Sequence, residues 1–313
     1  MEHYLHLIAG LAILLIGGDF LVRAGVSLAG HFKVSALVVG VTVVSFGTSA
    51  PELVVSLEAA ISNHPDIALG NVIGSNISNI GLVLAITVLI TPYFVNTFTV
   101  VRDWLVMIFI SLLLILFLNS GLLLSRMEGF VLLVILVVFV TWTIRHSRRQ
   151  LRNGNGTYPE TKYSVLVSIL IVVVSSIALV FGAQLLVRGA SEIASTFGIS
   201  ERVISVSVLA LGTSLPELAT SAVAAARKQN EISIGNIIGS NIFNILAILG
   251  ITASISPIRV ESREVLSFDL WYMLGISFLL MILILPLKGS ILGRWKGMVL
   301  VVSYVLFIYL VYL

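Results

Sequence analysis

The chain has 313 residues, of which 58% are hydrophobic and 11% are charged, and its mean hydropathy is +1.11. A soluble domain carries about a quarter charged residues, so this composition excludes an ordinary soluble protein and predicts an all-α polytopic membrane protein. The absence of cysteine excludes disulfide, zinc-thiolate and thiol redox chemistry. The pI near 9.3 does not predict a nucleic-acid partner, because the positive charge lies in loops, where it sets topology.

Apolar runs of about 20 residues, enough to cross a hydrocarbon core about 30 Å thick, recur along the whole chain. They predict ten spanning helices, over residues 4–22, 34–61, 66–91, 103–118, 127–144, 163–187, 199–226, 231–255, 268–286 and 297–313. The N-terminal "MEHYLH" has no basic segment, so the first run is predicted to be a spanning helix and not a cleaved signal. The polar stretch "RHSRRQLRNGNGTYPETK" divides the ten helices into five and five.

The two groups of five are copies of each other. A shift of 165 residues places "GTSAPEL" (47–53) on "GTSLPEL" (212–218) and "GNVIGSNISNI" (70–80) on "GNIIGSNIFNI" (235–245). Between 45–81 and 210–246, 19 of 37 positions are identical, and most of the identities are Gly, Pro, Ser, Thr, Asn or Glu. We therefore predict a first five-helix repeat at 1–144 with its motif at 45–81, a connector at 145–162, and a second repeat at 163–313 with its motif at 210–246.

An odd number of helices in each repeat predicts that the second repeat enters the membrane from the opposite side. Such inverted-topology repeats are common in secondary transporters. Thirteen of the 18 Lys and Arg residues lie on the same side as the connector 145–162. The positive-inside rule therefore predicts a multi-pass cell-membrane protein with a cytoplasmic connector and both termini outside.

The repeated motif places helix-breaking residues beside an acidic residue inside a spanning segment. Pro51 and Pro216 lack a backbone donor and should break their helices, and Gly47 and Gly212 accompany them. Exposed carbonyls and a buried glutamate are both costly in hydrocarbon. A bound cation answers both problems, because carbonyl and carboxylate oxygens are the ligands that Ca²⁺ prefers.

The inverted repeat should bring Glu52 and Glu217 together near the midplane. Hydroxyl and amide oxygens would join them from four further positions: Ser75, Asn79, Ser240 and Asn244. Gly74 and Gly239 would let the helices approach closely. A glycine or proline in one spanning helix is usually only a packing kink, but two copies of the whole set at one offset favour a binding site.

Two other groups of charged residues are interpreted differently. Asp19 and Arg23 lie four residues apart near a helix end, which indicates a local pair. Glu58 has Val223 as its counterpart, so the repeat gives it no equivalent in a shared site. The five histidines lie at the terminus or in loops, and no nucleophile–base pair or phosphate loop is present, so the sequence does not predict an enzyme.

The motifs "GTSAPE…GNVIGSNISN" and "GTSLPE…GNIIGSNIFN" resemble the two alpha repeats of the sodium/calcium exchanger family, in the cation/calcium antiporter superfamily. The five-plus-five layout is similar too, as in prokaryotic-type members without a large regulatory loop. The resemblance implies that Glu52 and Glu217 coordinate calcium with backbone oxygens of Thr48 and Thr213. It implies sodium sites at Ser49, Ser75, Ser214, Ser240 and the carbonyls of Ser45 and Ala210, with Asn79 and Asn244 between the glutamates.

Asn244 departs from several members of that family, which carry an aspartate there. The predicted site therefore holds two carboxylates, and one calcium or several sodium ions would balance their charge. Crowded cations repel strongly in a low-dielectric site, so the two kinds of ion would exclude each other and exchange would follow. The predicted function is sodium/calcium antiport with no covalent cofactor. A calcium/proton antiporter using the same glutamates remains the alternative, and a cation channel is the next.

Overall fold

The first half of the chain folds into a series of long and broken helices. The computed structural model describes residues 2–95, 97–154, 158–197, 212–285 and 290–311. The elements of this half are α1 (Glu2–Phe32), α2 (Ala36–Val39), the π-helical η1 (Gly40–Val44), α3 (Ser45–Thr48), α4 (Ala50–Ile61), α5 (Pro65–Ser78), η2 (Asn79–Leu84), α6 (Ala85–Ile90), β1 (Tyr93–Val95), α7 (Thr97–Gly121), β2 (Leu123–Leu124) and α8 (Arg126–Arg152).

The elements of the second half are α9 (Val165–Thr196), α12 (Leu215–Ala226), α13 (Asn230–Phe243), η4 (Asn244–Leu249), α14 (Gly250–Ile255), β3 (Ile258–Arg259), η5 (Val265–Asp269), α15 (Leu270–Ile284), β4 (Ser290–Leu292) and α16 (Arg294–Val311). From α12 onward the second half repeats the order of elements of the first half, with the π-helical η5 in addition. The boundaries of α4, α5, η2 and α6 coincide with those of α12, α13, η4 and α14 after a shift of 165 residues. The sequence repeat is therefore also a repeat of local structure.

Nine of the ten predicted spans correspond to helices in the described part of the chain. Eight helices there are long and apolar enough to cross a membrane, and a ninth span is the pair 36–48 and 50–61, which is bent by 48°. The remaining predicted span, 199–226, begins outside the described residues, and its later part forms α12. The structure thus supports a polytopic helical membrane protein.

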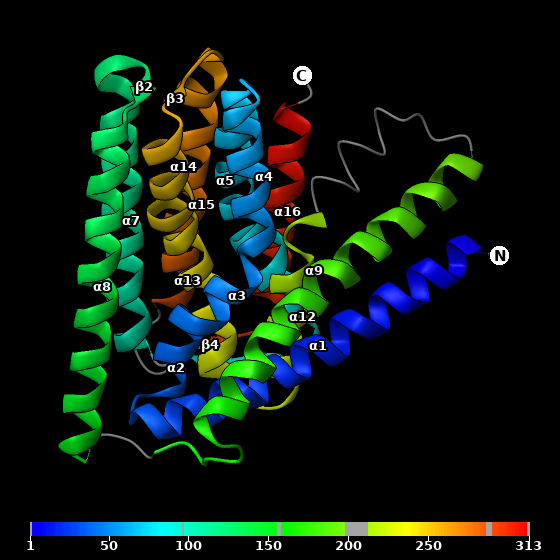
Figure 1. The fold of residues 1–313 in the computed structure, drawn as a ribbon, viewed down its shortest axis with the longest axis vertical. Helices are drawn as coiled ribbons and strands as arrows, with labels where there is room; N and C mark the ends of the chain where they lie inside the picture. The colour runs from blue at the N-terminus through cyan, green and yellow to red at the C-terminus, as the bar shows by residue number, and fades with distance from the viewer. Residues whose placement is uncertain (1, 96, 155–157, 198–211, 286–289, 312–313) are drawn as a thin grey trace.

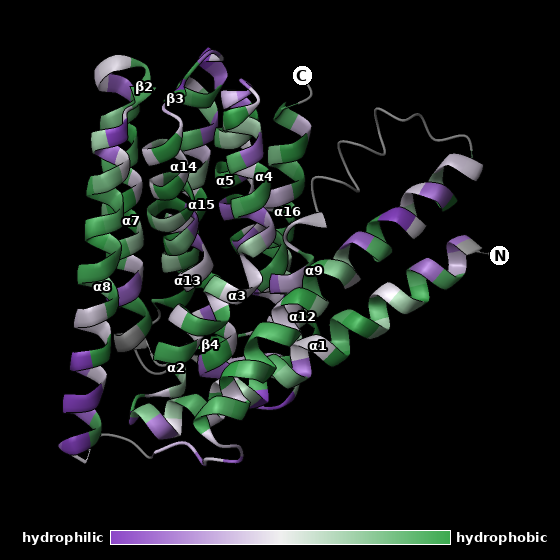
Figure 2. Ribbon diagram, viewed as in Figure 1, coloured by the Kyte–Doolittle hydropathy of each residue, from purple (hydrophilic) through white to green (hydrophobic). Residues whose placement is uncertain are grey.

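Three predicted helix ends are wrong by eight or more residues, one of them that of α9, which continues to Thr196 and not to residue 187. The first helix continues to Phe32 and not to residue 22, and α8 continues to Arg152, eight residues into the predicted connector. Hydropathy marks the thickness of the membrane, whereas a helix continues for as long as its residues favour it, and Arg, Gln and Leu are good helix formers. Figure 2 shows the far end of α8 as a polar continuation of an apolar helix.

Short strands join the two halves at opposite ends of the bundle. β1 pairs with β4 and β2 pairs with β3, both antiparallel. β2 and β3 lie at one end of the molecule and β4 lies at the other (Figure 1). Each pair therefore takes one strand from each half, as a two-fold relation between the halves would require.

The central helices carry the repeated motifs, and the outer helices face the surroundings. The most apolar 18-residue stretch of α13–α14 is 94% buried, compared with 22% for that of α8 and of α9. α1 and α9 lie side by side and cross the bundle obliquely (Figure 1). Much of each helix is coloured apolar (Figure 2), and exposed side chains such as Leu15 of α1 and Leu170 of α9 are hydrophobic, as expected for helices in contact with lipid.

Candidate functional site

The helix break at the first motif positions Glu52. α3 ends at Thr48, Ser49 separates it from α4, and Pro51 lies in the first turn of α4. Because proline has no N–H, it cannot bond to the Gly47 carbonyl, and it is tolerated in a first turn. Glu52 follows in the same turn, where the positive end of the helix dipole favours its negative charge.

The second motif is built in the same way. α12 begins at Leu215 with Pro216 and Glu217 in its first turn and Ser214 before it. Gly212 and Thr213 precede this helix, and Thr213 is half-buried. Ala210, for which a sodium-binding carbonyl is predicted, lies outside the described residues. The helices on either side of Ser49 are bent by 48°, and Pro216 occupies at the start of α12 the position that Pro51 occupies in α4.

The predicted ligands are brought together in the interior. Glu52, Glu217, Ser45, Thr48, Asn79, Ser240 and Asn244 are fully buried, and Ser49, Ser75 and Ser214 are at most 5% exposed. The hydroxyl of Ser49 donates to Oε1 of Glu217 at 2.9 Å, which links the two halves directly. Ser240 Oγ donates to the same oxygen at 3.5 Å.

Several side-chain oxygens of the predicted ligands have no hydrogen-bond partner. In the described part of the chain, six buried side-chain oxygens of the predicted ligands have no hydrogen-bond partner, namely both carboxylate oxygens of Glu52, Oε2 of Glu217, Oδ1 of Asn79, Oδ1 of Asn244 and Oγ of Ser214. Buried polar groups are almost always hydrogen-bonded. Oxygens grouped in this way are suited to a hard cation, and Ca²⁺ takes about 6–8 of them.

A second pair of asparagines fixes the two amides. Asn79 Nδ2 donates to Oδ1 of Asn241 at 3.0 Å, and Asn244 Nδ2 donates to Oδ1 of Asn76 at 2.9 Å. Asn76 and Asn241 also donate to each other's backbone carbonyls, at 3.3 and 3.2 Å. Both amide nitrogens of the predicted ligands are thus occupied, which leaves their oxygens available.

Sequence reasoning did not assign roles to Asn76 and Asn241, although the repeat carried the signal, because both positions hold asparagine at the same offset. It also missed the π-helical turns η2 and η4, which begin at Asn79 and Asn244. Such turns are rare and occur frequently at functional sites. Here each wide turn begins at a predicted ligand.

Three predictions concern backbone groups of the two motifs. The Ser45 carbonyl, for which the resemblance implies a sodium site, accepts hydrogen bonds from Ser49 N at 2.9 Å and from Thr48 Oγ1 at 3.3 Å. Close approach at Gly239 is confirmed, because an added Cβ would lie 2.6 Å from Val41 O. At Gly74 an added Cβ would meet nothing within 4 Å among the described residues, so the predicted close contact is not seen there.

The packing at Gly239 predicts a large effect on stability. Gly239→Ala should lower the melting temperature of the purified protein, because the added Cβ would lie 2.6 Å from the Val41 backbone and would also clash with Ser45 Oγ. Overpacking of this kind costs about 1–3 kcal/mol. Gly275→Ala is the matched control, because its Cβ would have open space and alanine favours the helix. Equal melting temperatures for Gly239→Ala and Gly275→Ala would contradict the prediction.

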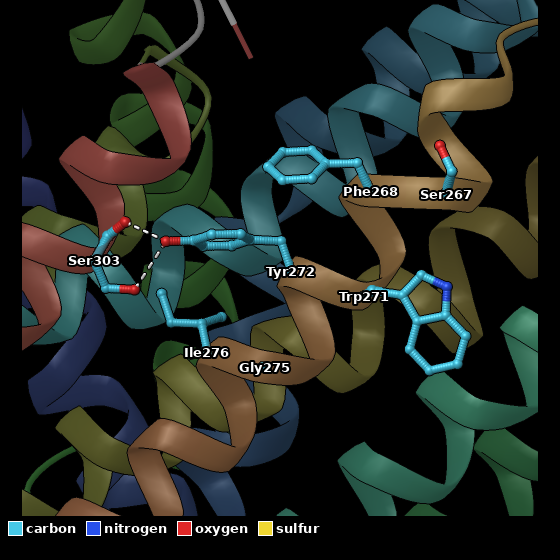
Figure 3. A pocket seen from close by; sticks show the side chains of 7 residues that line it. All are labelled: Ser267, Phe268, Trp271, Tyr272, Gly275, Ile276 and Ser303. Carbon is cyan, nitrogen blue, oxygen red and sulfur yellow. Dashed lines mark hydrogen bonds between the residues drawn. The ribbon is translucent and has the colours of Figure 1, made fainter. Parts of the chain in front are cut away.

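Away from the glutamates, a cavity of about 410 Å³ lies between α15 and α16. Its lining includes Phe268, Trp271 and Tyr272, and the Tyr272 hydroxyl points to Ser303, to whose carbonyl it donates at 2.5 Å (Figure 3). The cavity contains none of the predicted ion ligands. Its aromatic lining distinguishes it from the oxygen-lined site.

Comparisons with known proteins show which family the chain resembles. The model of the sodium/calcium exchanger protein family matches residues 3–145 and again residues 167–313. The chain is 32% identical to the sodium/calcium exchanger MaX1 of Methanosarcina acetivorans, over 98% of this chain and 97% of that protein. It is 33% identical to the inner membrane protein YrbG of Escherichia coli, over 98% and 95% of the two chains.

Among solved structures, the sodium-calcium exchanger NCX_Mj, soaked with Na⁺ and Ca²⁺, superimposes with a TM-score of 0.81 at 32% identity, and the match covers 99% of this chain and 98% of that one. Both halves of the chain match the family, and the likeness to relatives extends over nearly the whole length. The chain therefore belongs to the sodium/calcium exchanger family of membrane transporters.

Proposed function

We propose that this chain is a secondary active antiporter that exchanges sodium for calcium across the cell membrane by alternating access. The observation that carries the proposal is the set of six unpartnered oxygens around Glu52 and Glu217. It is also supported by the family to which the chain belongs and by the likeness to MaX1 and NCX_Mj. Calcium and sodium are the transported substrates, and neither is a resident cofactor.

The proposed architecture is ten spanning helices in two inverted five-helix repeats, residues 1–144 and 163–313, with the connector 145–162 between them. The strand pairs β1–β4 and β2–β3, which take one strand from each half at opposite ends of the bundle, support this arrangement. The ion site lies between the repeats near the membrane midplane.

In the proposed site, Glu52 and Glu217 supply two negative charges and Asn79 and Asn244 supply neutral oxygens. Thr48, Thr213, Ser49, Ser214, Ser75 and Ser240 complete the ligand set from neighbouring turns, together with the carbonyls of Ser45 and Ala210. One Ca²⁺ balances both carboxylates. Sodium ions use the same oxygens, and joint occupancy would crowd positive charge into a low-dielectric interior. Calcium and sodium therefore compete for the site. The protein changes between its outward- and inward-facing states with one kind of ion bound at a time.

The test of this function is radioactive calcium uptake into proteoliposomes loaded with sodium, potassium or a proton gradient in turn. Uptake that requires internal sodium supports the proposal. Uptake driven by the proton gradient alone would identify a calcium/proton antiporter with the same glutamates. Uptake that dissipates the calcium gradient without a counter-ion would indicate a channel.

The proposed orientation makes a separate prediction about labelling. The chain has no cysteine, so an introduced cysteine reports alone. Asn153, which caps the end of α8 and is exposed, would be cytoplasmic. A membrane-impermeant maleimide should label Asn153→Cys in inside-out vesicles and not in intact cells. Labelling in intact cells would reverse the orientation.

A further inference from the structure

The two long helices α1 and α9 are packed backbone against backbone. A Cβ added at Gly10 would lie 2.5 Å from Leu186 N, and one added at Gly189 would lie 2.6 Å from Leu7 N. Small residues at such contacts let helices approach closely in membranes. Because the contact is tight at both levels, α1 and α9 should move as one body, which we call the α1–α9 pair.

This pair contacts the two glutamate-bearing helices unequally. The 165-residue shift relates the contact of α1 with α12 to the contact of α9 with α4. α1 packs along α12, where a Cβ at Gly18 would lie 3.3 Å from Thr220 Cα, and the buried apolar cluster there includes Leu21 of α1 and Ala224 of α12. α9 touches α4 over a much shorter stretch. Figure 1 shows α1 and α9 diverging from the bundle toward the N-terminal end of α1.

An ion pair links α1 to α12 at the C-terminal end of α12. Asp19 on α1 pairs with Arg227, which caps α12, and also with Arg23 on its own helix at 2.7 Å. The predicted local pair of Asp19 and Arg23 is thus confirmed, and the partner on α12 was not foreseen. The Asp19 side chain is 20% exposed and that of Arg227 is 41% exposed, so solvent screens the pair only in part.

The repeat has no second copy of this pair. The counterparts of Asp19 and Arg227 are Gln184 and Ser62, which carry no charge. The counterpart of Arg23 is Arg188, which pairs with Glu192 at 3.0 Å on α9. The contact of α9 with α4 therefore lacks the ion pair that the contact of α1 with α12 has.

We infer that Asp19 and Arg227 form a one-sided latch that stabilises the conformation in which α1 covers α12 and that breaks each time the α1–α9 pair shifts toward α4. This inference rests on the proposed alternating access. In the proposed orientation Arg227 lies on the cytoplasmic side, so the latch closes the inner face and favours the outward-facing state. Asp19 and Arg227 are positioning residues that set how the protein divides its time between its two states.

The first experiment measures the half-saturating calcium concentration at each membrane face in Asp19→Asn, Arg227→Gln and the double variant. A ligand's apparent affinity scales with the population of the state that binds it. Loss of a partly buried ion pair should reduce the ratio of outward- to inward-facing protein by about two- to fivefold. Half-saturation at the cytoplasmic face should fall by a similar factor, with a smaller rise at the outer face.

The two single variants and the double variant should shift half-saturation equally, because either change removes the same pair. Arg23→Gln is the matched control, since it removes only the partner on the same helix and should leave the ratio of the two faces unchanged. Additive effects of Asp19→Asn and Arg227→Gln, or an equal shift in Arg23→Gln, would overturn the latch.

The repeat allows a mirror-image test. Gln184→Asp combined with Ser62→Arg places the same charges at the contact of α9 with α4, where both native side chains are exposed. This pair should stabilise the opposite state and shift the ratio of the two faces toward inward-facing, most strongly in the Asp19→Asn background. A shift toward outward-facing, or no shift, would contradict the one-sided latch.

A labelling measurement separates this inference from the proposed function. Ala224 of α12 is fully buried in the apolar cluster that also contains Leu21 of α1, and Ala224→Cys places a thiol there. A maleimide added from the cytoplasmic side should label it about two- to fivefold faster in Asp19→Asn than with Asp19 intact, whichever ion is transported. Equal labelling rates would overturn the latch even if sodium/calcium exchange is observed. Faster labelling in a protein that fails to exchange these ions would preserve the latch and reject the proposed transport.

Discussion

Glu52→Gln and Glu217→Gln should each reduce sodium-dependent calcium uptake by about 100-fold or more. Each variant keeps the size of the side chain and removes one of the two negative charges that would balance Ca²⁺. Removal of one partner from a buried charge pair costs about 3–5 kcal/mol, and each 1.4 kcal/mol is a factor of ten in affinity. The measurement is calcium uptake into proteoliposomes at matched protein content.

Neither variant should lose its fold. Both glutamates are fully buried, and a glutamine removes the cost of burying a charge together with its function. Size-exclusion profiles and melting temperatures should therefore match those of the unmodified protein in the absence of calcium. Added calcium should raise the melting temperature of the unmodified protein only, because a ligand stabilises the state that binds it.

Glu58→Gln is the matched control. Glu58 lies on α4, the same helix as Glu52, but it is exposed and its counterpart in the repeat is Val223. Uptake by Glu58→Gln should remain within about twofold of the unmodified protein, as is usual for a surface substitution. Near-normal uptake by a folded Glu52→Gln or Glu217→Gln protein would reject a site shared by the two carboxylates.

The parts of the site that the sequence predicts are the residues that occur in both copies of the repeat. Pro51 with Glu52 and Pro216 with Glu217 are conspicuous in an apolar chain, because the bilayer penalises each of them. Their duplication at one offset predicted both the division of the chain into two halves and the residues of the site between those halves. The structure places these residues at equivalent helix starts and joins them through the bond from Ser49 to Glu217.

The parts that the sequence does not predict depend on contacts between distant segments. The bond from Asn79 to Asn241 joins residues 162 apart, and the bond from Asn244 to Asn76 joins residues 168 apart. Nothing in local composition states which amide donates to which. The pairing of Asp19 with Arg227 is of the same kind, because an equally good partner for Asp19, Arg23, lies four residues along its own helix.

Helix ends were predicted less well than helix cores, for a physical reason. The boundary of an apolar run is set by the bilayer, whereas the boundary of a helix is set by capping and backbone hydrogen bonds. α8 shows the difference, because it ends at Arg152 with Asn153 as its cap, well beyond its apolar part. The π-helical turn η4 is also invisible to hydropathy, because all six of its residues are buried and no alternation of polar and apolar faces marks the change of phase.

Asn244→Asp should make transport depend on pH, and the hydrogen bonds around Asn244 give the reason. Its Nδ2 donates to Asn76 Oδ1 at 2.9 Å. An aspartate places an oxygen at that position, and two oxygens at that distance repel unless one carries a proton. Asn76 could rotate its amide instead, but it would then lose the bond from its Nδ2 to the Asn241 carbonyl. A proton on the new carboxyl restores the donor without disturbing Asn76.

A third carboxylate beside Glu52 and Glu217 also gives protons a further group to bind in competition with cations. Sodium-dependent calcium uptake by Asn244→Asp should therefore fall as pH falls, more steeply than in the unmodified protein and by at most about tenfold per pH unit for one competing proton. Asn79→Asp should behave in the same way, because Asn79 donates to Asn241 as Asn244 donates to Asn76. Asn244→Leu is the control for loss of the oxygen, and it should transport poorly at every pH. If both aspartate variants are active and their pH profiles superimpose on that of the unmodified protein, then these amides do not line the ion site.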